Sequence, residues 1–61
     1  MILEITGTDG LEVKIRNVVS VGQLMSHPDQ LYYLQINKRK GKATCHEIFV
    51  PFEKIKHWVL R

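Results

Sequence analysis

The chain has very little cysteine, and Cys45 is the only one. An intramolecular disulfide is therefore impossible, which excludes the class of small secreted domains built on a disulfide framework. An unpaired thiol is typical of a protein from a reducing compartment. On this basis we expect an intracellular, cytoplasmic protein.

Long apolar runs are also missing. No stretch approaches the roughly 18 consecutive apolar residues that a membrane-spanning helix requires. Residues 1–4 carry neither the basic residues nor the small residues of a cleavable signal peptide. We therefore expect no membrane partner. Apolar residues make up 44% of the chain and charged residues 25%, which is ordinary for a folded globular domain.

The chain is also short. Its 61 residues are enough for one domain, which we place at residues 1–61. A domain of this size buries only about 60% of the surface that its unfolded chain exposes, so its core is thin. Small domains of this kind commonly gain support from a partner subunit. The sequence therefore predicts a homo-oligomer or a protein-bound domain, with edge pairing through residues 31–37 or 43–50.

What is present is alternation with a period of two. Apolar and polar residues alternate over residues 1–6 and 11–16, which predicts two half-buried strands. Asp9 and Gly10 lie between them, and Asp-Gly is a strong hairpin signal because glycine accepts a positive φ. Asn17 interrupts the phase before Val18, so we expect one long strand that is bulged or bent at Asn17.

The second half of the chain continues the pattern. Residues 31–37 and 43–50 predict two strands joined by a four-residue turn, residues 38–41. Pro51 ends the second of these strands, and residues 52–56 are too few for a stable helix, so a single 3₁₀ turn is expected there. Residues 57–61 predict a last short strand. Residues 22–30 form the longest irregular stretch.

The chain is therefore predicted to be all-β, with five mainly antiparallel strands in a small barrel or a strongly curled sheet. This layout resembles the SH3-like and Sm-like small barrels, in which a one-turn 3₁₀ element commonly precedes the last strand. Val50 to Ile55 would occupy that place here. The resemblance concerns the layout of the elements, and the leading helix typical of Sm proteins is absent.

The core follows from the same alternation. On the apolar faces of the predicted strands we expect these residues to be buried: Leu3, Ile5, Leu11, Val13, Ile15, Val21, Leu34, Ile36, Ile48, Val50 and Ile55. In this arrangement Tyr32, Leu34 and Ile36 share one face of their strand. Tyr33 and Phe49 then point outward, whereas with the opposite parity they belong to the core, and the sequence alone does not decide between these two arrangements.

Histidine and cysteine are the residue types that suggest metal binding or nucleophilic catalysis. His27, Cys45, His46 and His57 lack the paired short spacings of structural zinc sites. Adjacent residues of a strand also point to opposite faces, so Cys45 and His46 do not readily share an ion. A Cys–His catalytic pair would need a pocket and an oxyanion site, for which so small a barrel has little room. We therefore expect neither an enzyme nor a cofactor, metal or small-molecule substrate.

Charge is the most specific signal in the sequence. Residues 31–61 hold seven basic residues against two acidic ones, and four of the seven fall within residues 38–42. Cations at a hairpin tip can reach phosphates and gain affinity through counterion release. The sequence predicts a module that binds RNA or DNA through Lys38, Arg39, Lys40 and Lys42, with Tyr33 and Trp58 as stacking residues.

Two other interpretations remain open. The basic turn can be a solvated hairpin tip that keeps the protein soluble, with the aromatic residues filling the core. Alternatively, the domain is a protein-interaction or assembly module that self-associates through strand edges.

Overall fold

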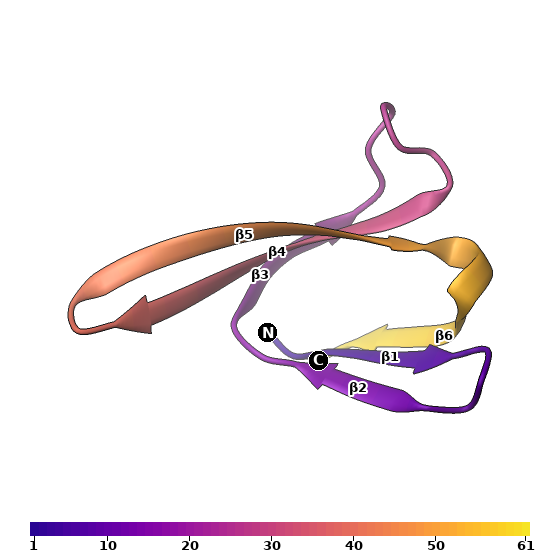
Figure 1. The fold of residues 1–61 in the computed structure, drawn as a ribbon, viewed down its shortest axis with the longest axis horizontal. Helices are drawn as coiled ribbons and strands as arrows, with labels where there is room; N and C mark the ends of the chain where they lie inside the picture. The colour runs from indigo at the N-terminus through magenta and orange to yellow at the C-terminus, as the bar shows by residue number, and fades with distance from the viewer.

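The computed structural model describes residues 1–61 and is all-β, with 66% of the residues in strands and no α-helix. Six strands and one 3₁₀ turn follow one another along the chain (Figure 1): β1 Leu3–Gly7, β2 Glu12–Ile15, β3 Val18–Gly22, β4 Gln30–Arg39, β5 Lys42–Pro51, η1 Phe52–Lys54 and β6 Ile55–Leu60. The 3₁₀ turn lies directly before the last strand, as the sequence predicts.

The strands form two antiparallel sheets of three strands each, in the orders β2-β1-β6 and β3-β4-β5. The predicted hairpin at Asp9-Gly10 joins β1 to β2. Gly10 has a φ of 87°, and the Asp9 side chain accepts a hydrogen bond from the Leu11 N–H at 3.0 Å. The prediction of an all-β, antiparallel fold is therefore confirmed.

The chain has six strands where the sequence predicts five, because residues 11–22 do not form one bent strand. They form β2 and β3, which belong to different sheets. Asn17 lies between them with a φ of 60°, a left-handed conformation that asparagine adopts more readily than most residues. This corner is attached to β4, since the Ile36 N–H donates to the Asn17 carbonyl at 3.0 Å and Gln35 Nε2 donates to the Arg16 carbonyl at 2.9 Å.

Backbone hydrogen bonds outside the strand ladders connect the two sheets. Met1 and Val18 exchange two of them, at 2.9 and 3.0 Å. At the 3₁₀ turn, the Phe52 N–H donates to the Asp29 carbonyl and the Thr8 N–H donates to the Lys54 carbonyl, both at 3.0 Å. The sheets are therefore joined at both ends of the fold.

The core lies between the sheets and is small. Its five buried residues are Leu3, Ile5, Val18, Leu31 and Tyr33. Six half-buried residues pack against them: Ile15, Val21, Ile48, Val50, Phe52 and Ile55. Of the eleven residues predicted to be core, Leu3 and Ile5 are buried, and Ile15, Val21, Ile48, Val50 and Ile55 pack around the core as half-buried residues.

The remaining four core predictions were wrong or incomplete. Leu11 and Val13 are 68% and 54% exposed. Leu11 lies directly before β2, and Val13 lies in β2, which is an edge strand of its sheet. In β4 the predicted faces are reversed. Leu31 and Tyr33 point into the core, and Leu34 and Ile36 are only half-buried on the opposite face.

The chain forms no helix with the length and apolar character needed to cross a membrane.

The observed faces of β4 predict that Leu31 contributes strongly to the free energy of unfolding. Leu31→Ala removes a side chain that is 2% exposed and should lower the free energy of unfolding by about 2–5 kcal/mol. Leu11→Ala is the matched control, since that side chain is 68% exposed and its removal should change stability by less than about 0.5 kcal/mol. Urea unfolding followed by circular dichroism measures both values. Equal costs for the two variants would contradict this description of the core.

Candidate nucleic-acid interface

The β4–β5 hairpin extends beyond the rest of the molecule (Figure 1). The β3–β4 ladder ends at Gln35, and the last hydrogen bond from β4 to the corner is the one from Ile36 to Asn17. From that point β4 pairs only with β5, in the register Asn37↔Thr44, Lys38↔Ala43 and Arg39↔Lys42. We call residues 37–44 the arm. Residues 38–47 are all exposed, so this part of the hairpin contributes nothing to the core.

The arm ends in a tight turn. Lys40 and Gly41 have φ values of 49° and 77°, and the flanking residues Arg39 and Lys42 are paired. Two central residues with positive φ define a type I′ turn, whose twist matches that of the flanking strands. The turn therefore comprises two residues, not the four expected from the sequence, and β4 and β5 are correspondingly longer. Lys40 holds a conformation that glycine and asparagine adopt more easily.

One face of the arm borders a groove. The groove has a volume of about 550 Å³ and is lined by Asn17, Asn37, Lys38, Arg39, Lys42, Thr44 and His46. It lies between the arm and the Asn17 corner. None of its lining residues is acidic and none is apolar. The groove therefore offers positive charge and hydrogen-bonding groups, and it fits an anionic, polar ligand.

The cations of the arm have no acidic partners. The two ion pairs in the structure join Glu4 to Lys14 and to Arg61, at 3.9 and 3.3 Å, and both lie on the β2-β1-β6 sheet. Lys38, Arg39, Lys40 and Lys42 form none. Their positive charge is therefore available to a ligand, whereas Arg61 is already paired with a carboxylate.

Three of the six predicted site residues do not line this groove: Lys40, Tyr33 and Trp58. Lys40 lies in the turn at the tip of the arm. Tyr33 is only 7% exposed and fills the core, so the prediction that it faces outward was wrong. Leu31 and Tyr33 alternate with Tyr32 and Leu34, and the sequence pattern could not distinguish these two apolar sets. Trp58 is 40% exposed, but it lies opposite Ile5 in β6, which belongs to the other sheet and not to the arm.

A different set of aromatic rings lies together on the outer face of the β3-β4-β5 sheet. Tyr32 and Phe49 are cross-strand neighbours with ring centroids 5.4 Å apart, and the His27 ring lies 4.3 Å from Phe49. His27 belongs to the loop between β3 and β4, so this loop covers one side of Phe49. Burial raises the pKa of the Tyr32 hydroxyl, and the nearby Glu47 and Cys45 raise it further.

Sequence reasoning missed four residues of the groove: Asn17, Asn37, Thr44 and His46. The signal was available in part. Once the turn is assigned to Lys40-Gly41, strict alternation places Asn37, Arg39, Lys42, Thr44 and His46 on one face. The contribution of Asn17 depends on the corner, and no local pattern predicts it.

The histidines and the cysteine do not come together. No three side chains of histidine, cysteine, aspartate or glutamate are placed to share a metal ion. Cys45 is exposed and paired with Ile36 on the outer face, whereas His46 lines the groove on the inner face.

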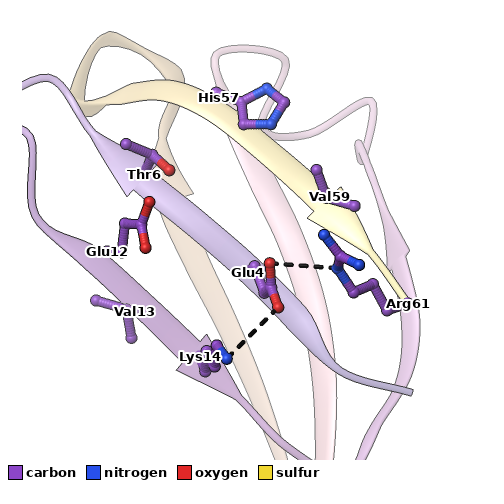
Figure 2. A pocket seen from close by; sticks show the side chains of 8 residues that line it. All are labelled: Glu4, Thr6, Glu12, Val13, Lys14, His57, Val59 and Arg61. Carbon is purple, nitrogen blue, oxygen red and sulfur yellow. Dashed lines mark ion pairs between the residues drawn. The ribbon is translucent and has the colours of Figure 1, made fainter.

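A second hollow, of about 210 Å³, lies on the outer face of the β2-β1-β6 sheet (Figure 2). Glu4 is at its centre, between Lys14 and Arg61, and His57 and Glu12 are at its margin. Its charges are mixed, and Glu4 already neutralises its neighbours. This hollow is therefore a weaker candidate for an anionic ligand than the groove at the arm.

Comparison with known proteins gives no relative for this chain: no family model, no curated protein and no solved structure matches it.

The burial of Tyr33 predicts a decrease in stability at alkaline pH. Burial raises the pKa of its hydroxyl above the ordinary value of 10.0 in the folded protein. Its contribution to stability is therefore complete below the unfolded-state pKa of about 10 and disappears as the pH rises through the folded-state value. Urea midpoints measured from neutral pH to about pH 11 should fall in the parent and fall less steeply in Tyr33→Phe. Parallel curves for the two proteins would show that Tyr33 is not the group responsible.

Proposed function

We propose that this domain is a non-enzymatic binding module that holds the phosphate backbone of a nucleic acid in the groove at the arm. We also propose that its two sheets are an open form of the SH3-like or Sm-like barrel layout, in which β2 and β3 together take the place of the one long strand expected from the sequence. The observation that carries the function is that the arm holds four cations without ion pairs, three of which line a groove with neutral hydrogen-bonding groups and no carboxylate.

The energetics of the arm support a polyanionic partner. Like charges placed this close together repel one another, which weakens a hairpin that is already supported by no third strand. A polyphosphate ligand removes that repulsion and releases its own condensed counterions. The cost of concentrating the charge in the free protein is therefore recovered in the complex.

The neutral side chains of the groove fit the same partner. Amide, hydroxyl and imidazole groups hydrogen-bond to phosphate and sugar oxygens, as at many protein–DNA contacts. Asn37 and Thr44 form one cross-strand pair, and His46 lies one step closer to the body of the domain. A backbone that follows the groove would meet these groups between the cations of the arm and the Asn17 corner.

Salt dependence tests this proposal. The parent should bind a mixed-sequence duplex or single strand at low salt, and its affinity should fall steeply as salt rises. Lys38→Ala combined with Lys42→Ala should lower the slope of log K against log salt by about 0.7–0.9 for each phosphate that the variant no longer neutralises. Fluorescence anisotropy of a labelled oligonucleotide provides the titrations.

Two control variants distinguish the effect of charge at the groove from the effects of overall charge and of turn geometry. Lys54→Ala combined with Lys56→Ala removes the same charge away from the groove, and it should leave the slope nearly unchanged. Lys40→Asn removes one cation of the arm with a residue suited to a type I′ turn, so its weaker binding would come from charge and not from turn geometry. A flat titration of the parent at low salt rejects the proposal.

A second candidate function, self-assembly, is favoured by the edges of the fold. β5 is the outer strand of its sheet and has no partner along its second side. β4 is the central strand and is paired with β3 as far as Gln35, so of the two expected edges the one at residues 43–50 is the free one along its length. Val13 in β2 and Trp58 and Leu60 in β6 add exposed apolar surface at the two edges of the other sheet.

Sedimentation distinguishes this candidate. An assembly module should sediment as a species heavier than its 7.1 kDa chain, and Glu47→Pro should return it to the monomer. In a two-residue hairpin the flanking pair directs its N–H groups inward, so residue 47 directs its N–H to the free edge and proline there leaves the β4–β5 ladder intact. A parent that stays monomeric at all accessible concentrations would rule out this candidate.

A further inference from the structure

The arm is a two-stranded ribbon with a defined size. Three residue pairs lie beyond the body of the domain, so its strands project about 10 Å at roughly 3.4 Å per residue. The major groove of B-form DNA is about 12 Å wide and 8.5 Å deep and admits a two-stranded β-ribbon. The major groove of A-form RNA is too narrow and deep for side chains to read. The shape of the arm therefore fits duplex DNA better than duplex RNA.

One face of the ribbon has the chemistry that reads base edges. Its two cross-strand pairs are Asn37 with Thr44 and Arg39 with Lys42. Asparagine pairs with adenine, arginine and lysine pair with guanine, and threonine hydrogen-bonds to either or contacts the thymine methyl group. All four side chains are polar, and none of them is acidic or engaged in an ion pair. The Thr44 hydroxyl makes only a 3.3 Å hydrogen bond to the Asn37 carbonyl.

The opposite face of the hairpin has a different character. It presents Ile36, Lys38, Ala43 and Cys45, of which Lys38 is the only side chain with a strong hydrogen-bonding group. Because the ribbon has one polar face and one mainly small or apolar face, only the polar face can hydrogen-bond to base edges. Lys38 starts from this opposite face, although its side chain also lines the groove of the domain, and Lys40 lies in the turn. Both can therefore reach phosphates on either side of the DNA major groove.

Single-strand binding by base stacking fits the arm less well. Residues 37–44 include no aromatic ring on which a base could stack. The nearest exposed-face pair, Tyr32 and Phe49, is covered on one side by His27, and Tyr32 lies close to the Glu47 carboxylate, which would repel a phosphate. Tyr33 is buried.

We infer that the arm enters the major groove of duplex DNA and that Asn37, Arg39, Lys42 and Thr44 contact base edges there in addition to making the phosphate contacts of the proposed nucleic-acid function, on which this inference rests. The domain therefore has a sequence preference in addition to its charge-driven affinity. Lys38 and Lys40 contact the backbone on either side.

A duplex with altered major-groove acceptors tests this inference. A preferred sequence is first selected from a random duplex pool with the full chain. The same duplex is then made with 7-deazaguanine and 7-deazaadenine, which replace the N7 acceptor by C–H and leave the phosphate charge unchanged. The parent should bind the deaza duplex about tenfold more weakly, with the same salt slope, because only base contacts are removed.

Variants assign the effect to the two faces. Asn37→Ala combined with Thr44→Ala should bind the two duplexes more nearly equally, at an unchanged salt slope. Lys38→Ala, on the opposite face, should lower the slope and keep the full difference between the duplexes. Circular dichroism confirms the fold of each variant, and the parent's own response to the deaza duplex decides the question if a variant fails to fold.

The outcomes separate this inference from the function on which it rests. Absence of binding to any nucleic acid at low salt overturns both. Equal affinity of the parent for the two duplexes, or tighter binding to single strands or duplex RNA than to duplex DNA, overturns the inference and leaves phosphate binding in place. No enrichment of any sequence from the random pool also overturns it.

Discussion

The corner at Asn17 is the constraint on which the rest of the structure depends. Its left-handed backbone carries the chain from one sheet to the other, and its carbonyl accepts the Ile36 N–H. These two features set the point at which β3 begins and therefore the point at which β4 loses its second neighbour. The arm exists because β3 begins only at Val18, so β4 and β5 continue past the end of β3 without a third strand. Asn17 also lines the groove, so the same residue defines the arm and one wall of its candidate site.

The sequence predicted the strand composition and the hairpins well, because these depend on local signals. Alternation over residues 1–6 and 11–16, Asp9-Gly10 and Pro51 each act within a few residues. The faces of β4 could not be predicted in the same way. Leu31 and Tyr33 compete with Tyr32, Leu34 and Ile36, and both sets are apolar. Only the tertiary partners, Val50 and Ile48 on one face and Phe49 and Glu47 on the other, decide which set is buried.

The residues of the candidate site also fall into those that local sequence signals predict and those that depend on tertiary structure. The four cations of residues 38–42 are adjacent in sequence, so composition alone located them. The neutral residues that complete the groove come from the corner, from β4 and from β5, and their convergence depends on the register of the hairpin. The prediction of Tyr33 and Trp58 as stacking residues of the same site was wrong because it rested on residue type alone. Tyr33 and Trp58 are the residue types that bind bases, but residue type does not tell whether a ring lies in the core or in the other sheet.

Stability and recognition occupy separate parts of this domain. The five buried residues come from β1, β3 and β4, and none belongs to the arm. A thin core leaves little free energy to spare, so substitutions there are costly. Substitutions at residues 38–44 of the arm leave the packing of the core intact, because all of these residues are exposed. The side chains of the arm can therefore change to suit a different partner while the fold is preserved. A domain with so small a core needs its binding residues to be separate from its core residues.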